Sequence, residues 1–145
     1  MRKALAFIIS VLCTPAIADP IADFYTGKTV NLYIGYSAGG GYDIYARLLS
    51  RHLGKHIPGK PTVIPQNMPG AGSLKVATYI NSVAARDGTA IGIFARGMPI
   101  YPLLFTPEFD GNKFGYLGSI TTDTSVCITW HNSPISKWSD VLEKP

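Results

Sequence analysis

The chain has 145 residues, of which 46% are hydrophobic and 15% are charged, and its formal net charge is +4. This size suits one globular domain, since a domain usually holds roughly 100–200 residues, and the hydrophobic content excludes a disordered chain. Lys and Arg are scattered along the sequence rather than gathered in a basic run. A nucleic-acid partner is therefore not expected.

The first eighteen residues have the pattern of a secretory signal peptide. Arg2 and Lys3 make a positively charged start, residues 4–13 form an apolar stretch, and the small-x-small sequence at 16–18 suits cleavage. The apolar stretch is shorter than the roughly 20 residues that a membrane-spanning helix needs. We therefore expect residues 1–18 to direct export and to be removed, with a retained anchor or lipidation as the alternatives.

The cysteines and histidines form neither a disulfide nor a metal-binding pattern. Removal of residues 1–18 would leave Cys127 as the one cysteine, so no internal disulfide is expected. Because Cys127 stands between Val126 and Ile128, we expect it to be a small buried residue. The three histidines have no cysteine or acidic partner at ligand spacing, so no metal site is expected.

Strand-like and helix-like patterns alternate along residues 30–94, which predicts an α/β fold. Alternating apolar residues mark the strands, apolar residues at helical spacing such as Ile44, Leu48 and Leu49 mark the helices, and glycine or proline separates them. Ser73 is expected to cap the second helix. The expected elements are strands at 30–34, 62–65 and 89–94 and helices at 44–53 and 74–83.

The last part of the chain has a less regular pattern. Residues 100–112 are rich in proline and are expected to be irregular, whereas 114–120 and 125–130 are expected to form strands. A final helix is expected at 137–143, with Ser136 as its cap. No strand follows that helix within the chain, so we expect the sequence to stop before its fold is complete.

Glycine-rich loops follow the first two expected strands. Parallel strands joined by right-handed crossovers bring their exit loops to one edge of the sheet, where open α/β sheets bind ligands. Residues 37–42 present backbone amides just before a helix, which suits a carboxylate or a phosphate. Residues 67–72 offer a second such loop, beside which Asn67 and Ser73 can bond a ligand or a water molecule. Tight turns would explain one loop, but two in corresponding positions favour a polar-ligand site.

Charged and aromatic side chains near these loops are further candidates. Asp43, in the first turn of the expected helix, either caps that helix or contacts the ligand. Arg47 either points back toward the loop or lies in solvent, and Arg96 on the third strand exit is the better candidate to bind a carboxylate. Tyr36 and Tyr42 flank the first loop, where they either wall a cleft or cover the helix end.

An enzyme motif overlaps the first loop. The sequence GYSAG at residues 35–39 fits the nucleophile elbow of serine hydrolases, with Asp123 and His131 following Ser37 in the required order. However, two further glycines prolong the loop, whereas an elbow needs its helix to begin at once. A secreted serine hydrolase therefore stays the alternative to a binding protein. No nucleotide cofactor is expected, because the glycines do not follow G-x-G-x-x-G and the P-loop lysine is absent.

Three segments together carry a resemblance to a known family: GYSAGGGYD at 35–43 with ARLL at 46–49, QNMPGAGS at 66–73, and DGT at 87–89. With them the chain resembles the Bug family, the extracytoplasmic solute-binding receptors of tripartite tricarboxylate transporters. The resemblance implies a periplasmic, two-lobed protein with a type II periplasmic-binding-protein-like fold. Such a receptor binds a small carboxylate without covalent chemistry or a cofactor, and delivers it to the membrane subunits of a permease.

The resemblance also divides the chain and suggests ligand contacts. Residues 19–120 would be an incomplete first α/β lobe that carries the ligand loops. Residues 121–145 would be the crossover strand and the start of a second lobe that is largely missing. Ligand contacts are then expected from Ser37, Ala38, Gly39, Gly40, Gly41, Asn67, Pro69, Gly70, Ala71, Gly72 and Ser73, to which the reasoning on charged residues adds Asp43 and Arg96.

Overall fold

The computed structural model describes residues 18–106, 109–122, 124 and 126–143. The chain divides into two compact units, with the boundary in the sequence after Gly115, and each unit is described by itself. The expected signal peptide falls almost wholly outside the described residues, so it stays a prediction. Among the described residues, no helix is both long enough and apolar enough to cross a membrane.

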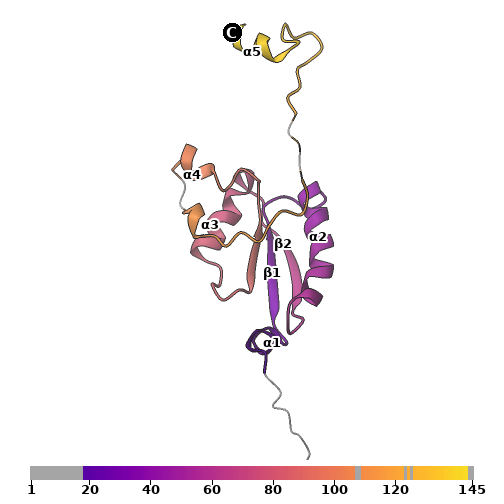
Figure 1. The fold of residues 1–145 in the computed structure, drawn as a ribbon, viewed down its shortest axis with the longest axis vertical. Helices are drawn as coiled ribbons and strands as arrows, with labels where there is room; N and C mark the ends of the chain where they lie inside the picture. The colour runs from indigo at the N-terminus through magenta and orange to yellow at the C-terminus, as the bar shows by residue number, and fades with distance from the viewer. Residues whose placement is uncertain (1–17, 107–108, 123, 125, 144–145) are drawn as a thin grey trace, which may run out of the picture. The chain divides into compact units, whose positions relative to one another are not determined.

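A three-stranded parallel sheet forms the centre of the first unit, which confirms the predicted α/β class (Figure 1). The strands are β1 (Thr29–Ile34), β2 (Thr62–Asn67) and β3 (Ala90–Ile93), and their order in the sheet is β2-β1-β3. In this register Ile34, Asn67 and Ile93 are neighbours at the carboxyl ends of the strands. The second strand extends two residues beyond its predicted end and therefore includes Asn67.

Helices α2 (Gly41–Leu53) and α3 (Leu74–Ser82) lie on opposite sides of the sheet (Figure 1). Alternate residues of β1 face opposite sides, so Leu32 and Ile34 pack with Ala46 of α2, whereas the Tyr33 ring contacts Tyr79 of α3 edge to face. A short helix α1 (Pro20–Tyr25) precedes β1, and the 3-10 turns η1 (Gly54–His56) and η2 (Ala71–Ser73) adjoin α2 and α3. Helix α2 lies in the crossover from β1 to β2, and α3 lies in the crossover from β2 to β3.

The buried face of α2 is not its most apolar face. Ile44 and Leu48 follow helical spacing as expected, but they are 61% and 50% exposed. Asp43 and Ala46 are buried instead, because the face that they share packs toward β1 and β2. The helix therefore presents a carboxylate, rather than a leucine, to the interior beside the strand ends.

The chain beyond β3 contains short helices, and the strands expected there are wrong. The residues described at 114–120 and 126–130 form no strand, because a strand exists only where a neighbouring strand accepts its backbone hydrogen bonds. The expected irregular segment contains α4 (Tyr101–Leu104) and the 3-10 turn η3 (Gly111–Lys113). Cys127 was expected to be buried and is exposed, because without a sheet nothing described covers residues 126–128.

The second unit ends in α5 (Trp138–Glu143), close to the predicted helix. Its cap differs from the prediction. The buried carboxylate of Asp140 accepts hydrogen bonds from the backbone amides of Ser136 and Lys137 and from the Ser136 hydroxyl. Ser136 thus donates to the cap instead of providing it, as in a capping box in which the acidic residue reaches back.

Candidate functional site

The exit loops of the three strands meet at one edge of the sheet, as the sequence predicted. The amide of Gly35 donates to the carbonyl of Ile93 over 2.9 Å, and the amide of Met68 donates to the carbonyl of Ile34 over 2.8 Å. Backbone hydrogen bonds therefore tie the starts of the first and second loops to the neighbouring strand. This places the residues after β1, β2 and β3 side by side at the carboxyl edge.

The first loop runs from Tyr36 to Gly40, the N-cap of α2. Gly39 has a φ of +85°, a backbone conformation that side chains other than glycine rarely adopt. Its amide donates to the carboxylate of Asp43 over 2.9 Å. No described residue accepts a hydrogen bond from the amide of Gly41 or Tyr42, which begin the helix. The amides of Gly41 and Tyr42, two and three positions after Gly39, are therefore free donors at the start of α2.

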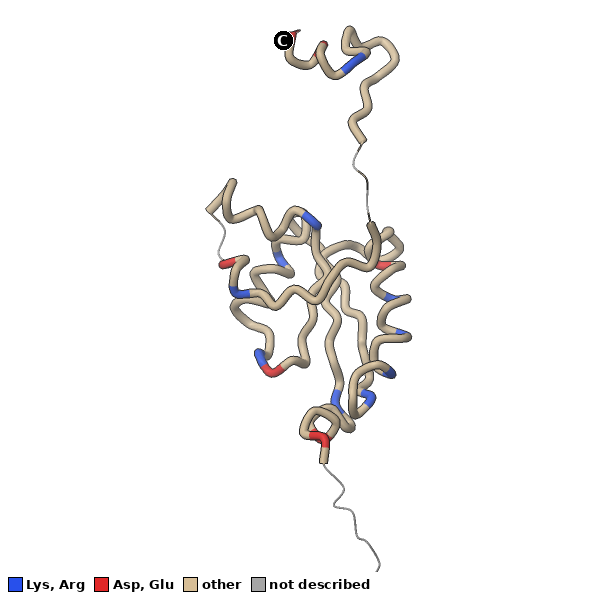
Figure 2. Tube along the Cα trace, in the orientation of Figure 1, with Lys and Arg blue, Asp and Glu red and all other residues tan. Residues whose placement is uncertain are grey.

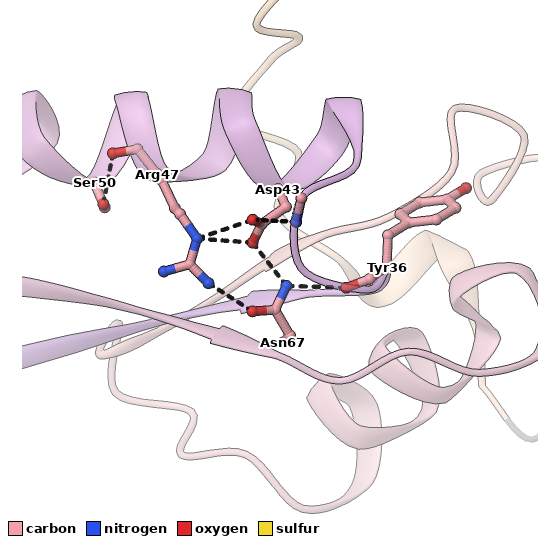
Figure 3. A network of polar contacts seen from close by, with 6 residues as sticks. Tyr36, Asp43, Arg47, Ser50 and Asn67 are labelled. Atoms are coloured by element: carbon pink, nitrogen blue, oxygen red, sulfur yellow. Dashed lines mark hydrogen bonds and ion pairs between the residues drawn. The ribbon is translucent and has the colours of Figure 1, made fainter.

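Asp43 is held in place by three partners (Figure 3). Its carboxylate accepts hydrogen bonds from Nε of Arg47 at 3.0 and 2.9 Å, from the Gly39 amide, and from Nδ2 of Asn67 at 2.8 Å. These donors, Arg47 first, hold the pKa of Asp43 well below its ordinary value of 3.8. Asp43 is only 3% exposed and is therefore a buried charge in the first turn of α2. The expected capping is wrong, because Asp43 accepts the amide of Gly39 in the loop and no described side chain caps the helix. The ligand contact that was its alternative role stays a prediction.

Asn67 joins α2 to the end of β2 (Figure 3). Its Nδ2 donates to the carbonyl of Tyr36 over 3.0 Å as well as to Asp43, and its Oδ1 accepts a 2.7 Å hydrogen bond from Arg47. Arg47 was not among the expected ligand contacts, but the first of its two expected orientations is confirmed, because it bonds Asp43 and Asn67 beside the loop. It stands four positions after Asp43, a spacing at which helical side chains of opposite charge pair. That spacing was the signal that could have identified it.

The second loop contains a run of unusual backbone conformations. Gly70, Ala71, Gly72 and Ser73 have φ values of +151°, +46°, +60° and +75°. Gly70, Ala71 and Gly72 are exposed, whereas Ser73 is completely buried. The expected capping of α3 by the Ser73 side chain is wrong, since its hydroxyl accepts a 2.7 Å hydrogen bond from the Ala95 amide. Ser73 therefore joins the second loop to the third.

The aromatic residues that flank the first loop pack on each other. The rings of Tyr36 and Tyr42 stack with their centroids 4.1 Å apart and their planes 17° apart. Burial, and then the neighbouring Tyr42, raise the pKa of the Tyr36 hydroxyl. The side chain of Tyr36 points away from the contacts of Asp43 and Asn67 (Figure 3). The pair therefore braces the start of the loop against the start of α2.

The remaining candidates are accessible. Ser37, Ala38 and Arg96 are exposed, and the described residues provide no histidine bonded to the Ser37 hydroxyl. Of the hydrolase partners, Asp123 lies outside the described residues and His131 belongs to the second unit. In the part of the chain that is described, no group of three or more His, Cys, Asp or Glu is placed to hold a metal ion.

Two open cavities lie near this edge, one beside the second loop and one against α2. One of about 400 Å³ lies beside α3, and its lining includes Met68 and Ala71 of the second loop. The other, of about 280 Å³, lies against α2 and is lined by Ile44, Arg47, Leu48 and Arg51. Neither Gly41 nor Tyr42 is among the residues that line these two cavities.

The fold and these loops define an open parallel α/β unit whose strand exits form one polar edge. The chain is 37% identical over 110 residues to "UPF0065 protein in gbd 5'region" of Cupriavidus necator, which covers 75% of this chain and 32% of that protein. It is 32% identical over 101 residues to "Protein BugT" of Bordetella pertussis, with 69% of this chain and 30% of that protein covered. The chain belongs to the Bug family, which confirms the resemblance found in its sequence.

The similarity covers only part of the relatives. The chain spans about a third of the length of the curated relatives that it matches. No family model matches the chain. No solved structure matches it either.

Proposed function

We propose that this chain is part of a periplasmic solute-binding receptor that captures a small carboxylate for a tripartite tricarboxylate transporter. The observation that carries the proposal is the meeting of two glycine-rich loops at the carboxyl edge of the sheet in a chain of the Bug family. Receptors of this family work with transporter membrane components, which supports the membrane subunits of a permease as the partner. The two-lobed type II fold and export through residues 1–18 belong to the same proposal.

Backbone donors would hold the carboxylate on this wall. The amides of Gly41 and Tyr42 stand at the positive end of the α2 dipole and have no acceptor among the described residues. The exposed residues of the second loop lie at the same edge. Arg96 on the third loop remains a candidate for a charge-assisted hydrogen bond to the ligand. The expected contacts in both loops stay proposals.

Anion binding at the first loop can be tested with citrate and succinate as probes. Gly40 has an extended backbone, and a Cβ there would lie 3.6 Å from the Ser37 carbonyl oxygen, an ordinary contact. Gly40→Val should therefore fold normally but cover the amides of α2. We expect NMR titration of the whole chain to move the Gly41 and Tyr42 amide signals, and Gly40→Val to weaken binding about tenfold or more.

The matched control is Gly115→Val, because a Cβ at Gly115 meets nothing within 4 Å and Gly115 lies outside the loops. This control variant should bind both probes like the unchanged chain. Equal binding by Gly40→Val and the unchanged chain would show that the first loop does not bind the anion.

The proposed function involves no covalent step. The nucleophile-elbow motif is the one feature that favours the alternative function, a secreted serine hydrolase. However, the Ser37 side chain is exposed and has no histidine partner among the described residues. Ser37→Ala separates the two functions. Hydrolysis of p-nitrophenyl acetate by the chain that disappears in Ser37→Ala would establish the hydrolase, whereas a receptor should show no such difference.

A further inference from the structure

We propose that Asp43, Arg47 and Asn67 position the first loop and balance its charge without touching the ligand. We call these three residues the loop clamp. The inference rests on the proposed function, since it concerns the site at which a carboxylate would bind. It changes the role of Asp43 and Asn67 from expected ligand contacts to positioning residues. It also adds Arg47, which was not among the expected ligand contacts.

The loop clamp bonds the first loop near both of its ends. At the start of the loop, the carbonyl of Tyr36 accepts a hydrogen bond from Asn67, and near its end the amide of Gly39 donates to Asp43. Asn67 and Asp43 come from different elements and are bonded to each other over 2.8 Å. The two loop contacts therefore depend on one connected set of side chains (Figure 3).

Apart from Nη1 of Arg47, the polar side-chain atoms of the loop clamp are already engaged within the protein. Both Asp43 oxygens, Nδ2 and Oδ1 of Asn67, and two nitrogens of Arg47 take part in hydrogen bonds among these residues and the loop. A ligand that bonded Asn67 or Asp43 directly would have to displace one of these bonds. The amides of Gly41 and Tyr42 can be reached without that cost, since no described residue accepts from them.

Arg47 has a separate electrostatic task. The carboxylate of Asp43 is a negative charge in the first turn of α2, next to the amides proposed to receive another anion. Nε of Arg47 lies 2.9 Å from this carboxylate and offsets its charge. Figure 2 shows that the charged residues along the rest of α2 are basic. Loss of the Arg47 charge should therefore weaken anion binding even though Arg47 is bonded to Asp43 and Asn67 instead of the ligand.

The test measures loop order and anion binding separately in the whole chain. Asp43→Asn removes the charged acceptor of the Gly39 amide, and Arg47→Gln removes the balancing charge at a side chain that is 41% exposed, so the second variant should fold. The matched control is Arg51→Gln, one turn further along α2, which takes no part in the loop clamp. Hydrogen exchange of backbone amides is measured first without a ligand, and citrate and succinate are then titrated.

We expect the Gly39 amide to exchange roughly tenfold faster in Asp43→Asn, since a hydrogen bond to a charged group is lost. The amide of Asn31, which bonds the Thr89 carbonyl inside the sheet, should exchange as in the unchanged chain. Arg47→Gln should weaken binding of the probes about tenfold, and Arg51→Gln should leave both measurements unchanged.

Three results separate the possibilities. Weaker anion binding with unchanged Gly39 exchange in the free Asp43→Asn chain would make Asp43 a direct contact and overturn the loop clamp. Equal acceleration of the Gly39 and Asn31 amides would show general destabilisation and would also overturn it. If only Gly39 exchange rises and the unchanged chain binds neither probe, the positioning of the loop by Asp43 is upheld, while the proposed function and the charge-balancing role of Arg47 fail.

Discussion

Gly35 is the residue at which β1 leaves the sheet, and its missing side chain lets that exit pass close to Ser73. A Cβ built on Gly35 would overlap the Cβ of Ser73 and would lie 3.0 Å from its Cα and 3.3 Å from the Ile93 carbonyl oxygen. Because Ser73 is completely buried, it has little freedom to move aside. Glycine is therefore needed at position 35 because the two loops pack closely there, and not because of its backbone conformation.

Gly35→Ala should therefore destabilise the chain by about 1–3 kcal/mol, the usual cost of overfilling a packed site. Urea unfolding followed by circular dichroism measures this change in the free energy of unfolding. Gly115→Ala is the matched control, since a Cβ at Gly115 meets nothing within 4 Å. If the two variants unfold at the same urea concentration, the close approach of Gly35 to Ser73 has no energetic importance.

The charge of Asp43 leads to a second prediction, which concerns how the stability of the chain depends on pH. Its pKa in the folded chain lies below the ordinary value of 3.8, so the unfolded chain takes up this proton first as the pH falls. The stabilisation from Asp43 is therefore complete well above pH 3.8 and is lost as the pH falls toward the folded pKa.

Urea unfolding at pH 6 and pH 3 should show that the unchanged chain loses more stability on acidification than Asp43→Asn. The variant should be less stable at pH 6 and nearer to the unchanged chain at pH 3. Equal losses between the two pH values in both proteins would mean that the contacts of Asp43 do not favour its charged form.

Among the elements, the contact of η2 with the third strand exit depends on one hydroxyl group. Ser73 Oγ accepts the Ala95 amide over 2.7 Å in the interior. Ser73→Ala would leave that amide without its acceptor, so we expect a loss of about 1–3 kcal/mol in the free energy of unfolding.

Ser50→Ala is a suitable comparison for this loss. The Ser50 hydroxyl donates to the Arg47 carbonyl within the same helix, so its removal leaves no backbone amide unpaired. Calorimetric melting should place Ser73→Ala well below Ser50→Ala in Tm. The reverse order would show that another donor or water replaces the Ser73 contact.

The regular elements up to β3 could be predicted because their patterns are local. Alternating apolar residues identified β1, and glycine and proline marked where the strands and helices end. The same local patterns wrongly predicted strands beyond β3, because a sequence such as 126–130 has the composition of a strand whether or not a partner strand is available. The exposure of Ile44 and Leu48 on α2 could not be predicted for a similar reason. Which face of a helix is buried depends on what packs against it, and the helical spacing of apolar residues does not contain that information.

The candidate site was predicted in its position more than in its chemistry. Parallel pairing brought the loops after β1 and β2 to one edge, as general rules of α/β sheets require. The αL conformation of Ser73 and the engagement of Asn67 with Tyr36 and Asp43 could not be predicted, because contacts across the sheet edge determine both. These contacts join residues more than twenty positions apart, beyond the reach of local patterns.

At the scale of the whole molecule, the loops form one wall of the proposed site. The chain spans about a third of the length of its curated relatives, and its loop amides are not enclosed by other described residues. A carboxylate on such a wall keeps water on its other side, so its hydrogen bonds gain little from burial. The affinity of the chain for a carboxylate should therefore be low, even if all the proposed contacts on this wall form.

We accordingly expect this chain to bind citrate or succinate with a Kd of about 1 mM or weaker, which corresponds to about −4 kcal/mol. Full-length Protein BugT of Bordetella pertussis, of which this chain matches 30% by length, is the comparison. For a carboxylate that both proteins bind, isothermal titration should give an affinity at least about a hundredfold higher for the longer protein, because further contacts and exclusion of water strengthen each charge-assisted hydrogen bond. Equal affinities would mean that the wall described here is sufficient, and that the remaining two thirds of the relative contribute to a step other than binding.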